Sequence, residues 1–329
     1  MAVRILRRQL FLAVSGIAIG LFALWVAIRG LNWNDMQTLI ERADLRVMVL
    51  AAFLYGASIL LRAIRWRILL LEIKPVLYSL VAEATTVGFA ANYILPARLG
   101  ELFRIDYLMR LTGVPRTASL GTLAIERLLD GVTVLGVILI GLIIAYVSGT
   151  ELGSAKRIIF FIAIAGTTLF SSLSLFVVLA PHLSRMAEAS AWPPAKMVAR
   201  VLHGVRALNN RTFISVSILT IAVWAAEALV LWCVLSGFHV WMSFGNLLIT
   251  MGCATLSTLV PTAPGFLGSY QLTFGLLLST FGSTSAAGIA TATAIQIFCY
   301  LPLTVVGLFL AARRSFHLFR IAQPDSQLE

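Results

Sequence analysis

The sequence contains few charged residues and few cysteines. Asp, Glu, Lys and Arg make up 12% of the 329 residues, whereas a soluble domain has about 25%. The three cysteines, Cys233, Cys253 and Cys299, stand alone inside apolar runs without metal-ligand spacing, so we interpret them as small buried hydrophobic residues. No GxSxG, Walker A, HExxH or EF-hand pattern occurs, and the longest polar segment, 181–212, is too short for an enzyme domain. These absences predict a chain that is not an enzyme and that has no soluble catalytic domain, no metal site and no cofactor.

Long apolar runs dominate the sequence instead. Hydrophobic residues make up 60% of the chain, and many runs are long enough to cross about 30 Å of hydrocarbon. The first run follows Arg4, Arg7 and Arg8 and is too long for a signal peptide, so we expect a retained first helix. The pattern predicts an all-α polytopic membrane protein, with apolar helices at about 10–28, 46–71, 77–95, 117–147, 157–180, 213–236, 244–260, 264–282 and 286–312.

Two segments, 92–101 and 259–268, interrupt the apolar runs with proline and glycine. Proline ends a helix and glycine permits a tight turn. Each segment therefore predicts a helix, a break and a second helix, and the short flanking runs favour two re-entrant hairpins over full spans. The predicted turn residues are Pro96, Gly100, Pro261, Pro264, Gly265 and Gly268.

The distribution of basic residues predicts the topology. With the N-terminus in the cytoplasm, most Lys and Arg fall in cytoplasmic segments, and 237–285 contains none. The positive-inside rule then gives about seven spanning helices in the cell membrane, with both termini cytoplasmic. The net charge of +11 is explained by this topology and by anionic lipid, so no nucleic-acid partner is expected.

The two breaks also indicate a weak internal repeat. Pro96 and Gly100 have the same spacing as Pro261 and Gly265, and a long helix follows each break. Inverted repeats with broken helices are frequent in transporters. We therefore divide the chain into a cytoplasmic tip, first helix and outer loop, a membrane domain with two half-repeats, and a basic cytoplasmic tail, at 1–44, 45–312 (halves 46–180 and 213–312) and 313–329.

Ionisable residues inside apolar runs are costly and mark candidate sites. Glu126, Arg127 and Asp130 lie within the run 117–147 and are spaced one turn apart. They are either an interfacial ion pair that fixes helix packing or the polar wall of a substrate cavity.

The first break carries a second group of candidates. Arg98 and Glu101 fall where a helix begins, and such a position attracts anions. The alternatives are a phosphate or anion site and a salt-bridged structural turn. Arg104 is either part of this site or a topology signal, and Asn92 is a further cavity candidate.

Two other sets of ionisable residues leave alternatives open. Arg62, Arg65 and Arg67 lie around Trp66 at a helix end, which favours arginines that reach the headgroups beside an interfacial tryptophan. The alternative is that Arg62 or Arg65 faces the helix bundle. Glu227 lies deep in the run 213–236, as a candidate proton-coupling group or a hydrogen-bonded packing residue. Glu83 is a second proton-coupling candidate and is expected to pair with an arginine nearby.

Four motifs in order resemble one protein family. They are RAIRWR at 62–67, the segment from Asn92 to Arg104, ERLLD at 126–130 and PGFLG at 264–268. Over about 45–312 the chain resembles the flippase-like membrane domain of lysylphosphatidylglycerol synthases and related stand-alone proteins. The resemblance implies two hairpins that frame a lipid cavity, with Arg98, Glu101, Arg104, Glu126, Arg127 and Asp130 as cavity residues.

The resemblance also implies a function. It predicts translocation of an anionic or aminoacylated phospholipid, or of a polyprenyl-phosphate or hopanoid-type lipid, with membrane lipids as partners. The resemblance does not extend to the cytoplasmic aminoacyl-transferase domain of the full synthases, and we expect this chain to lack it. The second hypothesis is a non-transporting accessory subunit for a separately encoded lipid-modifying enzyme. A third is an intramembrane transferase that uses Glu126 or Asp130 as a base. Tyr270 and Gln271 stand where an acidic residue is expected, which disfavours acidic coupling at the second hairpin.

Overall fold

The computed structural model describes residues 18–29, 31–95, 99–149, 210–259 and 263–321, together with residues 164, 167, 168, 171 and 175; the side chains of 210 and 315–321 are not described. Within these ranges the secondary structure is helical and contains no strand, which confirms the predicted all-α class. The predicted residues Pro96, Arg98 and Pro261 lie outside the described residues.

Long apolar helices form the frame of the molecule. They are α3 (Leu45–Leu71), α6 (Arg116–Val147), α9 (Asn210–Gly237) and a continuous helix made of α12 (Ser285–Ile295), η3 (Gln296–Tyr300) and α13 (Leu301–Ile321). Four helices in the described ranges are long and apolar enough to cross a membrane. The run at 157–180 lies almost wholly outside those ranges, so the count of about seven spans stays a prediction.

Shorter helices flank both predicted breaks. They are α4 (Tyr78–Ile94) and α5 (Gly100–Thr112) at the first, and α10 (Phe244–Ser257), η2 (Pro264–Phe266) and α11 (Ser269–Thr280) at the second. The four α-helices contain 17, 13, 14 and 12 residues. At 1.5 Å per residue each is about 18–26 Å long, which is less than the hydrocarbon thickness of about 30 Å.

The glycines at the two breaks have different roles. Gly265 and Gly268 adopt φ angles of 70° and 89°, in the left-handed region predicted for turn residues, and Pro264 begins η2 as expected. Gly100 is instead the first residue of α5, so its assignment as a turn residue is wrong. A Cβ atom there would lie 2.3 Å from the carbonyl oxygen of Gly88 on α4, so glycine permits the close approach of the two helices.

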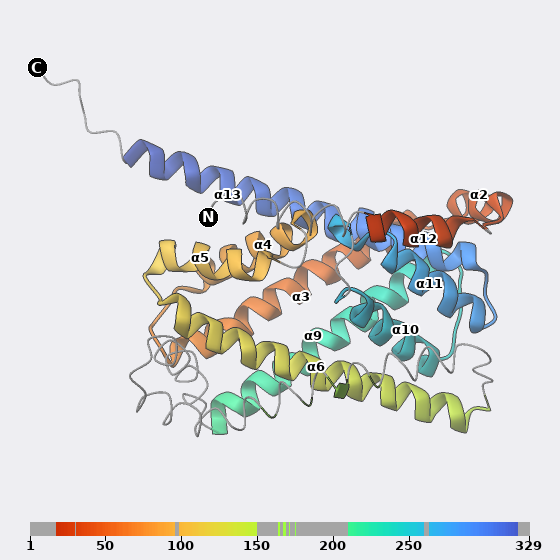
Figure 1. Cartoon of the computed structure of the whole chain (residues 1–329), viewed down its shortest axis with the longest axis horizontal. Coiled ribbons are helices and arrows are strands. Elements are labelled where there is room, and N and C mark those ends of the chain that lie inside the picture. Colours follow the sequence, from red (N-terminus) through yellow and green to blue (C-terminus); the bar gives the residue numbers. More distant parts are fainter. Residues whose placement is uncertain are drawn as a thin grey trace, which may run out of the picture.

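The helices pack in related pairs. Helix α3 packs along α9, α6 packs on α10, and α13 packs on α4. Figure 1 shows α3 and α9 crossing the middle of the molecule, with α6 along one edge and α13 along the other. Each outgoing long helix therefore contacts the hairpin of the other half of the sequence.

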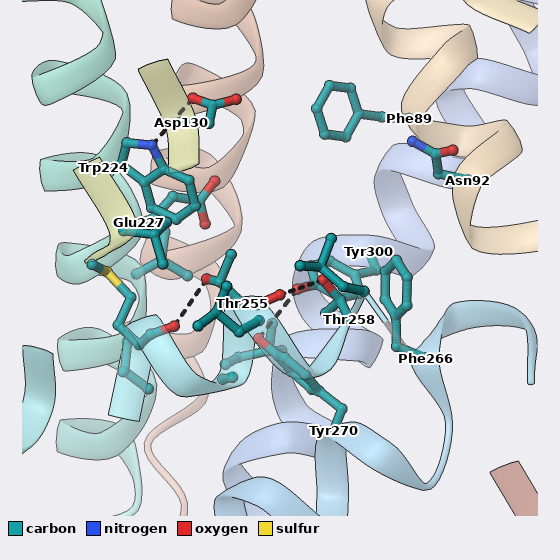
Figure 2. Close-up of a pocket in the computed structure, with 18 of the residues that line it drawn as sticks. Phe89, Asn92, Asp130, Trp224, Glu227, Thr255, Thr258, Phe266, Tyr270 and Tyr300 are labelled. Carbon is teal, nitrogen blue, oxygen red and sulfur yellow. Dashed lines mark hydrogen bonds between the residues drawn. The ribbon is translucent and has the colours of Figure 1, made fainter. Parts of the chain in front are cut away.

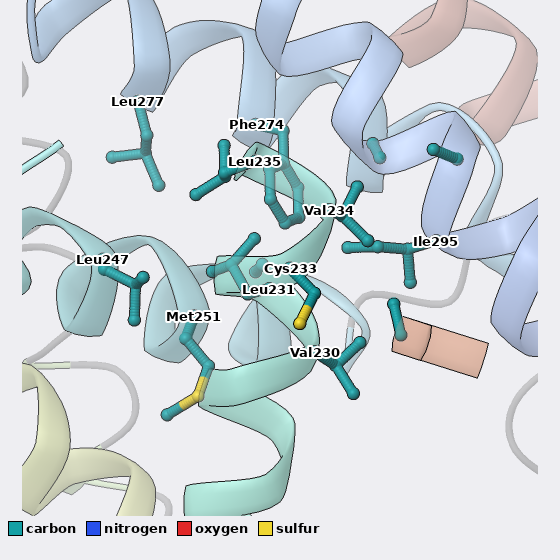
Figure 3. Packing of buried hydrophobic residues seen from close by; sticks show 14 of the residues in the cluster. Val230, Leu231, Cys233, Val234, Leu235, Leu247, Met251, Phe274, Leu277 and Ile295 are labelled. Atoms are coloured by element: carbon teal, nitrogen blue, oxygen red, sulfur yellow. The ribbon is translucent and has the colours of Figure 1, made fainter. Parts of the chain in front are cut away.

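The largest hydrophobic core joins α9 to the second hairpin. Leu231 of α9, Met251 of α10, Phe274 of α11 and Ile295 of α12 belong to one buried cluster (Figure 3). A smaller cluster around Trp66 and Leu108 holds the first hairpin against α3. All three cysteines are free and buried, as predicted.

One helix lies where the sequence predicted an outer loop. Helix α2 (Trp33–Glu41) begins after Asn32, whose side chain accepts a hydrogen bond from the backbone N–H of Asn34 at 3.1 Å. Met36 and Leu39 pack against the large core, and α2 contacts α12. Only part of α2 is apolar, so it lacks the continuous run by which the longer helices are recognised.

Candidate functional site

A cavity of about 620 Å³ lies between the helices, and both hairpins help to line it. Figure 2 shows Asp130, Trp224 and Glu227 on one side and Phe89 and Asn92 across from them. One part of the wall is charged, whereas most of the remainder is aliphatic or aromatic. The cavity is therefore amphiphilic.

Four arginines and four carboxylates form one ion-pair network at the charged end. The arginines are Arg62, Arg65, Arg104 and Arg127, and the carboxylates are Glu101, Glu126, Asp130 and Glu227. Helices α3, α5, α6 and α9 supply them. Charges that are buried near the membrane interior are tolerated when they are paired, and here the numbers of positive and negative groups are equal.

The inner part of the network is inaccessible to solvent. Arg65 donates to both carboxylate oxygens of Asp130 at 2.6 and 3.1 Å and contacts Glu126 at 3.4 Å. Glu126 also accepts from Arg104 at 2.6 Å, and the side chains of Arg65 and Glu126 are 0% exposed. The guanidinium of Arg104 lies 4.1 Å from the centroid of the Trp66 ring. These contacts lock α3, α5 and α6 together.

The outer part of the network lines the cavity. Arg127 pairs with Glu101 at 3.1 Å and with Asp130 at 3.3 Å. Arg62 pairs with Glu227 at 3.0 Å, and Glu227 accepts a further hydrogen bond from the Ser58 hydroxyl at 2.8 Å. Five members of the network thus reach the cavity: Arg62, Glu101, Arg127, Asp130 and Glu227.

The arrangement decides between the alternatives for α3. Arg62 and Arg65 are buried and face the bundle, so their assignment to the membrane interface is wrong. Trp66 is also fully buried and donates to Thr122 at 3.1 Å, so it is not an interfacial aromatic. The arginines are buried because carboxylates on α6 and α9 are their partners, and the local sequence of α3 gives no sign of these partners.

The charged residues of α6 and of the first break are divided between packing ion pairs and the cavity wall. Arg127 and Asp130 lie in the cavity wall, whereas Glu126 is a packing ion pair behind it. Glu101 forms a salt bridge and also lines the cavity. Arg104 belongs to the buried network. Asn92 lines the cavity too, and its buried Oδ1 accepts no hydrogen bond within the described part of the chain.

Glu83 and Glu227 have different surroundings. Glu83 pairs with Arg314 of α13 at 3.0 and 3.3 Å and accepts from the Tyr107 hydroxyl at 2.7 Å. The expected arginine pairing of Glu83 is confirmed, but the partner is distant in sequence and Glu83 is not among the residues that line the cavity. Glu227 is in the cavity wall and finds its arginine across helices, on α3.

A cluster of tyrosines at the other end of the cavity was not predicted. The hydroxyls of Tyr55 and Tyr93 are hydrogen-bonded to each other, and the Tyr300 hydroxyl donates to that of Tyr270 at 3.2 Å. The rings of Tyr93 and Tyr300 stack with centroids 4.3 Å apart. Tyr300 ends the π-helix η3, a feature that is frequent at functional sites. The nearby Pro302, which lacks an N–H, is the one local signal for this irregularity.

Two glutamines hold the second break where an acidic residue was expected. Gln271 accepts from the backbone N–H of Gly268 at 2.9 Å and donates to Gln296 at 2.6 Å. Gln296 in turn donates to the carbonyl oxygen of Gly265 at 2.8 Å. An amide can donate and accept at once, so neutral side chains close this chain of hydrogen bonds.

Fold and site together define a polytopic helical membrane protein with an amphiphilic cavity between two short-helix hairpins. The sequence profile of the family described as the lysylphosphatidylglycerol synthase TM region matches residues 13–307. The chain belongs to this family, which confirms the resemblance drawn from the four motifs.

One curated relative is named "Glycosyltransferase AglD" and comes from Haloferax volcanii. It is 21% identical over an alignment 329 positions long, which covers 89% of this chain and 53% of the relative. The chain thus spans about half the length of the curated relative that it matches. The family and the relative suggest a lipid-related function in a membrane; the expectation that the chain is not an enzyme stays a prediction.

Proposed function

We propose that this protein translocates a lipid across the cell membrane. The headgroup passes through the cavity between the hairpins, and the hydrocarbon tails stay in the bilayer. The observation that carries the proposal is the amphiphilic cavity, in which ion-paired Arg62 and Arg127 share one space with aliphatic and aromatic walls. A charged headgroup crosses hydrocarbon at a high cost in free energy. The charged side chains of the cavity lower that cost, because they replace part of the water that hydrates the headgroup.

The substrate classes are anionic and aminoacylated phospholipids and polyprenyl-phosphate or hopanoid-type lipids. The planar guanidinium of arginine fits phosphate oxygens in a bidentate manner. Arg127 has partners on both α5 and α6, and Arg62 has a partner on α9, so headgroup binding at either residue is coupled to contacts between helices. That Arg98 also binds phosphate is part of this proposal on the ground of the sequence alone, because Arg98 lies outside the described residues.

The proposal includes a membrane arrangement. We infer that both hairpins are re-entrant, because their helices are shorter than the hydrocarbon core. The contacts of α6 with α10 and of α13 with α4 support an inverted repeat, since each outgoing helix contacts the hairpin of the other half. Both termini are cytoplasmic in this arrangement.

Lipid movement in proteoliposomes tests the proposal. Fluorescent phosphatidylglycerol, its lysyl form and a polyprenyl phosphate are each assayed with the purified full chain. We expect faster movement of one lipid than in empty vesicles, and roughly tenfold slower movement with Arg127→Ala, because about 1.4 kcal/mol of lost headgroup binding changes affinity tenfold.

Arg110→Ala is the matched control. Arg110 pairs with Asp106 on the exposed face of α5, away from the cavity, so its loss removes an arginine without touching the proposed path. Movement of none of the three lipids by correctly inserted protein would overturn translocation. Equal slowing of lipid movement by both variants would instead mean that the headgroup does not pass through the cavity.

The second candidate function is a membrane subunit that holds a lipid for a separate lipid-modifying enzyme. The observation in its favour is the relative named as a glycosyltransferase, of which this chain matches only 53%. A chain that binds lipid, moves none and co-purifies with such an enzyme would favour this candidate over translocation.

A further inference from the structure

We propose that Glu227 takes up one proton whenever an anionic lipid headgroup binds in the cavity, so that lipid movement is coupled to a proton gradient. This inference rests on the proposed function and adds an energy source to it. It comes from the way in which the arginines of the network are shared among its carboxylates.

The network has no surplus positive charge in the part of the chain that the structure describes, because its four arginines face four carboxylates. An anionic headgroup that binds one of these arginines adds a negative charge to a largely apolar cavity. A buried carboxylate that loses its partner is costly as an anion and is neutralised by a proton. Binding of an anionic headgroup should therefore bring one proton onto one of the four carboxylates.

Two of the carboxylates keep arginine partners that a headgroup in the cavity does not reach. Asp130 accepts two hydrogen bonds from Arg65, at 2.6 and 3.1 Å, and also pairs with Arg127 at 3.3 Å. Glu126 pairs with Arg65 at 3.4 Å and with Arg104 at 2.6 Å. The side chain of Arg65 is 0% exposed. Asp130 and Glu126 therefore stay ionised when the headgroup binds.

The other two carboxylates, Glu101 and Glu227, each pair with one arginine among the described residues. Glu101 lies in the first turn of α5, where the helix dipole and the free N–H groups also stabilise an anion. Glu227 lies in the middle of α9, away from both helix ends. Its second hydrogen bond comes from the Ser58 hydroxyl at 2.8 Å. A hydroxyl can donate to a carboxylate or accept from a carboxylic acid, so Ser58 suits both protonation states of Glu227.

Arg62, the partner of Glu227, is well placed to move to a headgroup. Its Nη2 lies 3.0 Å from Glu227, and its buried Nε has no acceptor among the described residues. The rings of Phe89 and Trp224 lie 5.5 and 5.4 Å from its guanidinium carbon. These rings stabilise the guanidinium by cation–π attraction while its carboxylate partner is exchanged for a phosphate.

The surroundings of Glu227 offer no second cation within the described ranges. Arg127 lines the same cavity but pairs with Glu101 and Asp130. The other titratable groups that face Glu227 carry no positive charge; they are Tyr55 on α3, Tyr93 on α4, Asp130 on α6, Tyr270 on α11, and Cys299 and Tyr300 on η3. A proton is therefore the positive charge that can replace Arg62 at Glu227.

Calorimetry tests the inference by counting the protons. The purified full chain in neutral maltoside detergent is titrated at neutral pH with dioctanoyl phosphatidylglycerol, once in phosphate buffer and once in Tris buffer. The ionisation enthalpies of these buffers differ, so the difference between the two heats gives the number of protons taken up per lipid. We expect about one proton per lipid, because the net charge of the site then stays constant.

Two variants identify the group that takes up the proton. Glu227→Gln should bind phosphatidylglycerol without proton uptake, because glutamine is neutral and leaves Arg62 free for the phosphate. Asp106→Asn removes a carboxylate from the exposed pairs on α5 and should keep the uptake of the unaltered protein. A packing defect weakens binding but does not change the number of protons per bound lipid. Unchanged uptake in Glu227→Gln would overturn the role of Glu227.

A pH gradient tests the coupling without any variant, in case Glu227→Gln fails to fold. Proteoliposomes with fluorescent phosphatidylglycerol are prepared with the interior about one pH unit more alkaline than the exterior. With one proton per lipid, this gradient should enrich the lipid in the inner leaflet by up to about tenfold. A membrane potential alone should have no effect, because the anionic lipid and its proton together carry no net charge.

The outcomes separate this inference from the proposed function. Binding of phosphatidylglycerol without proton uptake, or movement that ignores the pH gradient, would overturn the inference and leave translocation standing. Neither binding nor movement of phosphatidylglycerol would overturn both for anionic phospholipids. Glycerophosphoglycerol, which lacks acyl chains, is titrated alongside the lipid. If it binds as tightly as the lipid, the ligand is a soluble phosphodiester, and the coupling to lipid movement is overturned.

Discussion

The two breaks in the helical frame have similar geometry but are held by different chemistry. The first hairpin, α4–α5, is joined to its neighbours through buried charge, above all by Arg104 to Glu126 and Glu101 to Arg127. The second hairpin, α10–α11, lies in a segment without a charged residue and is held by amides, glycines and apolar packing.

The difference in chemistry between the hairpins indicates that they contribute differently to the one cavity. Charged groups near the first hairpin offer partners that a headgroup can exchange. The second hairpin instead contributes Tyr270, Phe266 and aliphatic side chains to the wall, and these have no charged partner to exchange. Breaking a buried ion pair costs more than losing a hydrogen bond between neutral groups. The ion-pair network that holds the first hairpin should therefore be far more sensitive to the loss of one residue than the amides that hold the second.

The largest effect is expected for Arg65→Ala. This change leaves Asp130 and Glu126 buried without their central partner, and breaking a buried ion pair costs about 3–5 kcal/mol. The midpoint of thermal unfolding in detergent should fall strongly. Arg67→Ala is the control on the same helix, because within the described ranges Arg67 donates to the carbonyl oxygen of Val76 at 2.9 Å and to no carboxylate. Equal losses from the two variants would contradict the special role of the network.

A smaller effect is expected for Gln296→Leu at the second hairpin. Leucine keeps the size but removes the partner of Gln271 and of the Gly265 carbonyl, and unsatisfied buried groups cost about 1–3 kcal/mol. Thermal unfolding of the same preparation measures the change. Gln37→Leu is the control, since Gln37 donates to Glu41 on the exposed α2. A loss larger than that of Arg65→Ala would reverse the comparison between the ion-pair network and the second hairpin.

The sequence predicted the frame better than the site. Long apolar runs define α3, α6 and α9 within a few residues of their observed ends, because about twenty apolar residues have few alternatives to a spanning helix. The breaks were predictable because proline and glycine act locally. Helix α2 was not predicted, because its apolar residues are interspersed with polar ones.

The site depends on contacts between distant segments. Nothing near Arg65 in the sequence shows that Asp130 will lie 2.6 Å away, so the same arginine pattern fits an interfacial position equally well. Tyr55, Tyr93 and Tyr300 stand on separate elements, and no spacing rule links them. Ionisable groups in apolar runs were the one usable signal, and they located the charged end of the cavity but gave no sign of the aromatic end.

The smallest loss of stability is expected for Asp106→Asn, which removes an exposed carboxylate of α5 outside the cavity. Arg110 donates to Asp106 at 2.7 Å, and Arg116 donates to its other oxygen; these hydrogen bonds, Arg110 first, hold the pKa of Asp106 below its ordinary value. A lowered folded-state pKa stabilises the fold above the unfolded value of about 4. That stabilisation disappears as the pH falls through the folded pKa.

Asp106→Asn should therefore lower the free energy of unfolding by less than about 1 kcal/mol at pH 7, and the unfolding midpoint only slightly, because exposed ion pairs contribute little. The difference between the unaltered protein and the variant should vanish well below pH 4, where the carboxyl is protonated in both states. Unfolding midpoints of the two proteins, measured side by side from pH 7 to pH 3, provide the check. A difference that stays constant with pH would mean that Asp106 acts through packing. A difference as large as that of Arg65→Ala would mean that buried and exposed ion pairs contribute equally to stability, which would contradict the comparison.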